Sequence, residues 1–143
     1  MAKLLLAMLV VVLQLPAIAQ KQGIKGQVFW LSGNQMPGPE KKIPPYQGII
    51  REVVIYPEIK LNDTKQTDGF FTDIQGMPVA SVASKADGSF RIKLPPGNYS
   101  VFVKESKGLF ANLFDGRGII NPITVKPKKY TWITLTIDYE AVY

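Results

Sequence analysis

The chain has 143 residues, with 17 Lys and Arg against 11 Asp and Glu, and it contains neither histidine nor cysteine. The missing residue types exclude disulfides, cysteine nucleophiles, Ser-His-Asp triads, histidine acid–base catalysis and ordinary zinc sites. The length fits one domain built around one core.

The first twenty residues have the layout of a secretory signal peptide. Lys3 supplies a short positive region, Leu4 to Leu13 form an apolar run, and Ala17-Ile18-Ala19 gives the small-x-small cleavage pattern. A membrane-spanning helix needs roughly 20 apolar residues, so a membrane anchor is the weaker interpretation. We expect removal of residues 1–19, leaving a single domain over residues 20–143 that is periplasmic or secreted and has no transmembrane segment. With no cysteine to accept a lipid, we expect no lipoprotein anchor.

The charge that remains after cleavage is positive but scattered. Without Lys3 there are 16 basic and 11 acidic side chains, a formal charge of +5, and the only basic doublets are Lys41-Lys42 and Lys128-Lys129. Such a balance can favour contact with anionic polysaccharide or membrane surfaces, but the preferred interpretation is a solvated surface with lysines on strand edges, where they protect against aggregation. The basic residues are not interleaved with aromatic ones, so we expect no nucleic-acid partner.

Short runs that alternate with period two dominate the chain, and no segment shows sustained helical periodicity. Gly, Pro, Asn and Asp bound these runs, as expected for strands and turns. About seven short strands in one domain are typical of an antiparallel sandwich. We expect strands at 24–30, 49–56, 78–84, 88–94, 98–104, 120–126 and 130–138.

The alternation also assigns the buried face of three strands. In strand 88–94 the apolar residues alternate with Arg91 and Lys93, so a one-residue slip would place charges in the core. The residues expected to point inward are Phe90, Ile92, Leu94, Tyr99, Val101, Val103, Ile133, Leu135 and Ile137.

Three connections are longer than hairpin turns, at 32–47, 57–77 and 105–119, and no strand pattern is visible in the second. Loops longer than about 12–15 residues are usually functional or disordered. In the third, Leu109, Phe110, Leu113 and Phe114 have helical spacing, which predicts one short helical turn that plugs the open end of the sandwich. The alternative is an exposed apolar patch that docks a partner.

The stretch DGSFRIKLPPGNYSVFV, residues 87–103, reads as turn, strand, turn, strand. Asp87-Gly88 favours a tight turn with positive φ at the glycine. In the second turn, Pro95 and Pro96 precede Gly97, for which we also expect a positive φ. Every feature of the stretch therefore has a backbone or packing reason.

Four motifs in order resemble those of the carboxypeptidase regulatory-like domains, which have a transthyretin-like (prealbumin-like) fold. They are Gly26-Gln-Val28, Val53-Val-Ile55, Asp87-Gly-Ser-Phe90 and Leu94-Pro-Pro-Gly-Asn-Tyr99. The resemblance implies a seven-stranded antiparallel Greek-key β-sandwich that serves as an accessory or interaction module, with no catalytic residues and no cofactor. The hydroxyisourate hydrolases of the same fold depend on histidines, which this chain lacks.

Exposed aromatic residues are the candidate contacts for a ligand or partner, and core packing is the competing interpretation of each. The candidates are Trp30, Tyr46, Phe70, Phe71 and Trp132. The leading hypothesis is a non-enzymatic module that binds or scaffolds an envelope protein or polysaccharide. A carbohydrate-binding module that uses the exposed aromatics is the first alternative.

Loop carboxylates provide a second alternative, a carboxylate-dependent hydrolase. Asp63, Asp68, Asp73 and Asp115 are its candidate acids. The first three, with Asn62, also suggest a calcium site, since that ion takes six to eight oxygen ligands. All of these residues lie beside Gly or Asn or within turn-rich sequence, where Asp commonly serves the turn itself.

Overall fold

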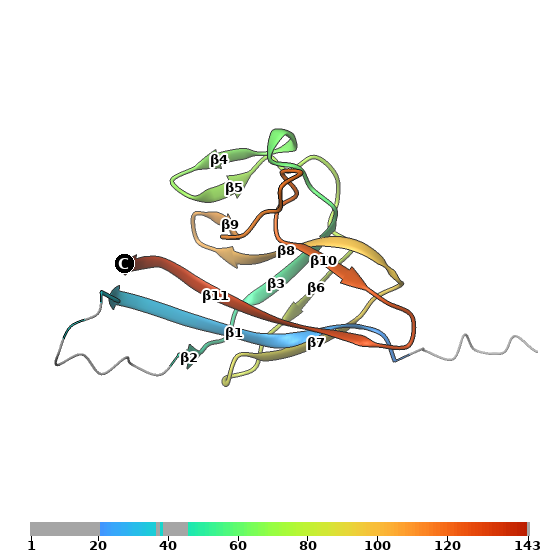
Figure 1. Cartoon of the computed structure of the whole chain (residues 1–143), viewed down its shortest axis with the longest axis horizontal. Coiled ribbons are helices and arrows are strands. Elements are labelled where there is room, and N and C mark those ends of the chain that lie inside the picture. Colours follow the sequence, from blue (N-terminus) through green and yellow to red (C-terminus); the bar gives the residue numbers. More distant parts are fainter. Residues whose placement is uncertain (1–20, 37, 39–45, 143) are drawn as a thin grey trace, which may run out of the picture.

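The structure, a computed structural model, describes residues 21–36, 38 and 46–142 and consists of two β-sheets packed face to face (Figure 1). The expected fold class, an all-β antiparallel sandwich, is confirmed. The expected signal peptide, residues 1–19, lies outside the described residues. Within the described part, no helix has the length and apolar character that crossing a membrane requires.

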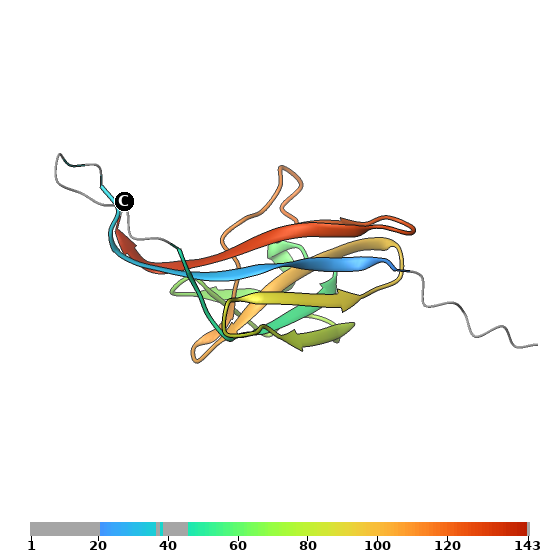
Figure 2. The ribbon, with the colours of Figure 1, turned by 90° about the horizontal axis from the view of Figure 1, so that it is seen from below.

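The smaller sheet brings the first and last strands of the fold together. Its four strands are β1 (Gly23–Asn34), β2 (Gln47–Gly48), β7 (Ser89–Lys93) and β11 (Tyr130–Val142). β1 pairs in parallel with β11 along one edge, and it pairs antiparallel with β7 and β2 along the other. Figure 2 shows β1 (blue) and β11 (red) side by side. Parallel neighbours need a long connection, which here is the whole remainder of the domain.

The larger sheet is antiparallel throughout. Its strands are β3 (Glu52–Pro57), β4 (Lys65–Thr67), β5 (Phe70–Thr72), β6 (Ala80–Ala83), β8 (Gly97–Glu105), β9 (Gly108–Phe110) and β10 (Pro122–Val125). They run in the order β4-β5-β9-β8-β3-β6, and β10 also pairs with β8. Each of the seven expected ranges overlaps a strand, while β4, β5 and β9 are short strands inside the long connections and β2 lies at the end of the first connection.

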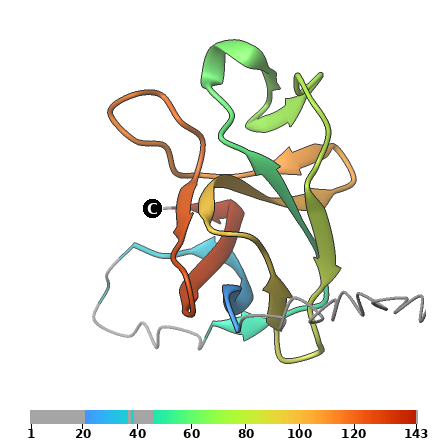
Figure 3. The same cartoon turned by 90° about the vertical axis from the view of Figure 1, so that its right-hand side faces the viewer.

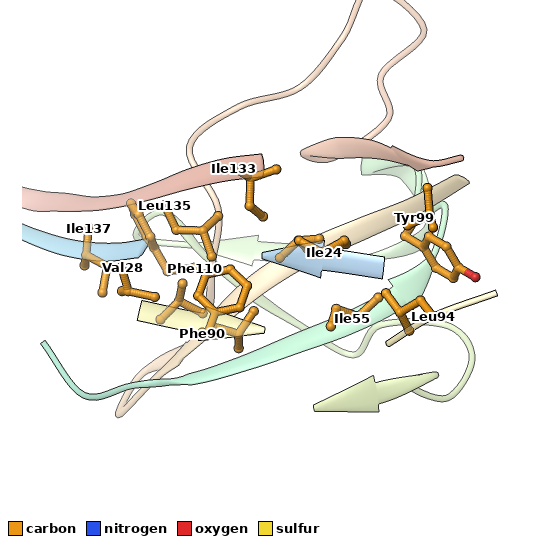
Figure 4. Packing of buried hydrophobic residues seen from close by; sticks show 14 of the residues in the cluster. Ile24, Val28, Ile55, Phe90, Leu94, Tyr99, Phe110, Ile133, Leu135 and Ile137 are labelled. Carbon is orange, nitrogen blue, oxygen red and sulfur yellow. The ribbon is translucent and has the colours of Figure 1, made fainter. Parts of the chain in front are cut away.

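The main core lies between the two sheets (Figure 4). Of the residues expected to face inward, all are buried except Ile92, which is half-buried against the same cluster. Burial raises the pKa of Tyr99, and its hydroxyl donates to the Pro95 carbonyl oxygen. The period-two alternation therefore predicts the core faces of β7, β8 and β11 correctly.

A second, smaller core lies on the other face of the larger sheet, which the alternation alone does not predict. Ile59, Phe71, Phe102 and Ile120 form it. Figure 3 shows the short 3-10 helix η1 (Leu61–Asp63), which covers this face, lying away from the smaller sheet. The segment between β9 and β10 also covers this face and reaches the smaller sheet, where Asn112 donates to the Thr136 carbonyl oxygen of β11 at 3.2 Å. The larger sheet is thus covered on both faces.

Two expectations about the long connections are wrong. The connection 57–77 contains η1 and the hairpin β4–β5. The helical turn expected at residues 109–114 is absent, because the β8–β9 hairpin turns at residues 105–108 and places Leu109 and Phe110 on a strand. Phe110 lies in the main core. Leu113 and Phe114 are 59% and 63% exposed, so they do not close the end of the sandwich as expected.

The turn glycines behave differently from each other. Gly88 has the expected positive φ of 85°, and a Cβ there would collide with the Val28 carbonyl oxygen. The positive φ expected for Gly97 is wrong: this residue begins β8 and is not among the described residues with positive φ. The two prolines before Gly97 complete the turn, so the strand starts one residue earlier than expected.

Candidate binding face on the four-stranded sheet

The outward side of the four-stranded sheet carries polar, basic and aromatic side chains. Along β11, Ile133 and Leu135 are buried in the core, so Trp132 and Thr134 point outward. The same alternation holds for β1 and β7. We call this surface the outer face and define it by Lys25, Gln27, Phe29, Ser89, Arg91, Lys93, Tyr130, Trp132, Thr134 and Thr136.

Strand register places Trp132, Lys25 and Arg91 in one row. Trp132 stands beside Lys25 in the parallel pair β11–β1, and Lys25 stands opposite Arg91 in the antiparallel pair β1–β7. Neighbouring strands lie about 4.8 Å apart, so the row is about 10 Å wide. The next row along the strands is polar and uncharged, and it consists of Thr134, Gln27 and Ser89.

Tyr130 holds the two cations of this row in one place. The guanidinium carbon of Arg91 lies 4.9 Å from the centre of the Tyr130 ring, and Nζ of Lys25 lies 5.9 Å from it. Both distances fall within the range of cation–π attraction. The tyrosine therefore sets the position of two positive charges beside Trp132.

Trp132 separates two open hollows and is itself 57% exposed. The hollow toward β7 has a volume of about 370 Å³ and that toward β10 about 460 Å³, both within the usual size of ligand sites. The first is lined by Lys25, Gly26, Lys85, Ser89, Phe90 and Arg91. The second is lined by Pro122, Ile123, Thr124, Lys126, Lys129, Tyr130, Thr131 and Ile133.

The carboxylate of Asp87, at the turn before β7, is already engaged. The Ser89 hydroxyl donates to it at 2.6 Å and the Ser89 backbone N–H at 2.9 Å. These hydrogen bonds lower the pKa of Asp87, the hydroxyl contributing most. The carboxylate thus serves the turn that the Asp87-Gly88 pattern predicts.

The five aromatic candidates lie in three different environments. Trp132 stands on the outer face. Tyr46 is also 57% exposed, and the centre of its ring lies 5.7 Å from the centre of the Phe29 ring on the same face. Trp30 is half-buried, edge-on to Tyr139 at the rim of the main core.

Phe70 and Phe71 are core residues. They are 3% and 2% exposed, in the main and second core respectively. Neither presents a ring to solvent, so the structure gives no support to a ligand-contact role for them. Of the five candidates, it brings only Trp132 and Tyr46 onto one exposed sheet face.

Sequence reasoning missed Lys25, Arg91 and Tyr130 as partners of Trp132. The alternation within each strand predicts that these three side chains point outward. It does not predict which strands are neighbours, and the row depends on the parallel pairing of β1 with β11. The cations look scattered along the chain, and the fold gathers them beside aromatic rings.

Another hollow, of about 380 Å³, lies on the seven-stranded sheet. Phe71 forms part of its wall, and Tyr56, Ile74 and Leu109 border it while packing against the second core. Because these side chains already serve the packing of the covering segments, the outer face of the smaller sheet is the stronger candidate site.

The loop carboxylates are held in turns and ion pairs. Asp68 and Asp73 have φ values of 53° and 52°, and Asp73 lies 3.7 Å from Nζ of Lys65. Asp115 accepts from the backbone N–H groups of Arg117 and Ile119 at 2.9 and 3.0 Å. In the parts of the chain that the structure describes, no three His, Cys, Asp or Glu side chains gather as a metal site would require.

The chain matches no protein-family model and no curated protein sequence.

Proposed function

We propose that this chain is an exported, non-enzymatic binding module of the cell envelope that binds polysaccharide through its outer face. Trp132 carries the proposal, because its large indole is 57% exposed between two hollows on a sheet face. A sugar ring presents C–H groups on one side, which pack on the π-face of an aromatic ring. Its hydroxyl groups need polar partners, and the row of Thr134, Gln27 and Ser89 supplies them. The Gln27 amide N–H and the Ser89 hydroxyl already donate to Asp87, so these two residues offer their oxygens as acceptors.

The proposed location and family have sequence support. Lys3, the apolar run and Ala17-Ile18-Ala19 favour export to the periplasm or the outside. We further propose kinship with the carboxypeptidase regulatory-like domains, supported by the order of the four motifs and consistent with a sandwich. N-terminal sequencing of the processed protein should give Gln20 as its first residue; an intact Met1 on membrane-bound protein would contradict export.

The non-enzymatic part of the proposal rests on residue types. Without His or Cys the chain has none of the usual nucleophile–base pairs. Asp115 and Asp73, two of the four candidate acids, are engaged with Arg117 and Lys65. We therefore assign the chain binding rather than catalysis, and no cofactor.

Comparison of two exposed aromatic residues, one on the outer face and one on the segment between β9 and β10, tests polysaccharide binding. Trp132→Ala should weaken binding to an immobilised polysaccharide panel at least about tenfold, the effect of losing a central aromatic anchor. Phe114→Ala is the matched control, because Phe114 is 63% exposed but lies between β9 and β10. Affinity electrophoresis of the mature protein measures both.

Indole fluorescence provides a direct readout of the same event. The chain has two tryptophans, and a bound sugar should shift the emission of exposed Trp132 while leaving that of half-buried Trp30 unchanged. Absence of binding to every polysaccharide of the panel, or an equal loss in Phe114→Ala, contradicts the proposal.

An envelope protein is the second candidate partner, favoured by one observation. Leu113 and Phe114 stand exposed on a loop that hydrogen bonds hold in place, including Asn121 N–H to the Leu113 carbonyl oxygen at 2.8 Å. A pull-down from the native envelope that Phe114→Ala abolishes and Trp132→Ala leaves intact would favour this candidate instead.

A further inference from the structure

The strands β1 and β7 place two positive charges directly opposite each other. Lys25 and Arg91 are cross-strand partners, an arrangement that destabilises a sheet when the charges are alike. Both head groups lie over the Tyr130 ring, which attracts cations but carries no net charge. Tyr130 therefore attracts both head groups without cancelling their positive charge.

Basic side chains gather on the outer face, whereas five ion pairs join residues in or beside the larger sheet. Four more lysines border the outer face or its two hollows: Lys85, Lys93, Lys126 and Lys129. The carboxylates beside these cations are Asp87, which stays charged while it accepts from Ser89, and Asp138 at the far end of β11, so the surface keeps an excess of positive charge.

The cations and the indole share one hollow. Lys25, Arg91 and Trp132 all line the hollow of about 370 Å³. The row is about 10 Å wide, so a sugar ring on Trp132 places its substituents within reach of both cations. A guanidinium is suited to bind a planar anion such as a carboxylate with two parallel hydrogen bonds, and an ammonium adds a point charge.

We propose that the outer face binds acidic polysaccharides, with Lys25 and Arg91 binding a carboxylate or sulfate group while Trp132 packs against the sugar ring that bears it. This inference rests on the proposed polysaccharide-binding function and specifies its ligand class. The uncharged row of Thr134, Gln27 and Ser89 beside the cations suits sugar hydroxyls, which is why a sugar chain fits this face better than an anionic lipid surface or a nucleic acid.

Matched pairs of polymers test the anionic preference. Polygalacturonate and its methyl ester share a backbone and differ in the free carboxylate, and dextran sulfate and dextran differ in the sulfate. The mature protein should bind at least one acidic polymer about tenfold or more tightly than its neutral partner. Raising the salt concentration should reduce this preference, because salt screens exposed charges.

The variant that tests the residues is Lys25→Gln with Arg91→Gln. It should lose most of the preference for the acidic polymer and most of its salt dependence, while retaining the weaker binding to the neutral partner. Lys60→Gln with Lys107→Gln is the control, because it removes the same charge from exposed lysines near the larger sheet. The control variant should keep the preference.

The melting curve of the Lys25→Gln, Arg91→Gln variant gives an independent readout. The substitution relieves like-charge repulsion and also removes the two cation–π contacts with Tyr130, so its melting temperature at low salt should stay close to that of the unmodified protein. Cooperative unfolding also shows that a loss of binding is not a loss of fold.

Each remaining outcome counts against a different statement. Equal affinity for acidic and neutral polymers would overturn the inference while the polysaccharide function stands. Binding to no polymer at all would overturn both. Tighter binding to vesicles of anionic lipid, or to duplex DNA, than to either acidic polymer would also overturn the inference. If the Lys25→Gln, Arg91→Gln variant kept the full preference for the acidic polymer, these two residues would not be the source of that preference.

Discussion

The two sheets of this sandwich differ in what covers their outward sides. The larger sheet is covered there by η1 and the segment between β9 and β10, which form a second core with Phe71 and Phe102 of the sheet. The smaller sheet keeps its outward side open, with a 57% exposed tryptophan and a row of charges. The long connections therefore serve structure on one layer, and the plain strands of the other layer provide the surface for function.

The largest expected effect comes from the covered side. Phe102 is fully buried in the second core and lies edge-on to Tyr56 and Phe71, at ring distances of 5.6 and 5.8 Å. Phe102→Ala should lower the free energy of unfolding by about 3–5 kcal/mol, the usual cost of removing a buried ring. Urea unfolding measures it. A loss as small as that of an exposed residue would mean that the covering segments do not form a core.

A smaller effect is expected from the hydrogen bond that ties the covering segment to the sheet. The hydroxyl oxygen of fully buried Ser100, on β8, accepts from the backbone N–H of Ile59 at 2.9 Å. Ser100→Ala leaves that N–H without its partner and should cost about 1–3 kcal/mol. Thr134→Ala on the open side is the control, and an equal, small change in both would contradict the assignment.

The pH dependence of stability tests how the β9–β10 segment is held. The pKa of Asp115 is lowered, first by the hydrogen bond from the Ile119 N–H and further by those from Arg117. A carboxylate with a lower pKa in the folded state stabilises the fold above its unfolded pKa, and this contribution is lost as pH falls through the folded value.

Asp115→Asn should therefore lower the urea midpoint at pH 7, and its difference from the unmodified protein should shrink as the pH falls below the ordinary value of 3.8. The difference for Thr134→Ala should stay constant over the same range. A difference for Asp115→Asn that widens on acidification would show that the carboxylate is not stabilised in this way.

The smallest effect belongs to the open side. Trp132→Ala should change the free energy of unfolding by no more than about 0.5 kcal/mol, because most of the side chain already faces solvent. Urea unfolding of the Trp132→Ala variant used for binding measures this change in the free energy of unfolding. A loss comparable to that of Phe102→Ala would place Trp132 in the packing and withdraw it from the binding face.

Sequence alternation predicts what depends on neighbours along one strand. It places Phe90, Tyr99 and Ile133 in the core, and the Asp87-Gly88 turn has the expected backbone. It fails where a residue's environment is set by a distant segment. By alternation Phe102 lies on the face of β8 that is expected to meet solvent, yet Ile59 and Ile120 cover it.

The candidate site could be predicted only in part for the same reason. The parity of Trp132 is visible in the sequence, but Lys25 and Arg91 join it only through strand pairings between distant parts of the chain. Spacing also misleads at residues 109–114, where helical periodicity coincides with a strand and a loop. Gly97 shows a related limit, because two prolines complete the turn before it.

The pairing of β1 with β11 makes the order of synthesis matter. Residues 23–34 emerge from the ribosome before the other strands of the domain, and the strand that completes their sheet consists of residues 130–142. Contacts of such long sequence separation form slowly. Until they form, one edge of β1 exposes unpaired backbone groups, which is the kind of edge on which chains aggregate. A chain stalled before β11 is made would therefore be a target for chaperones and proteases, since β11 pairs with that edge of β1.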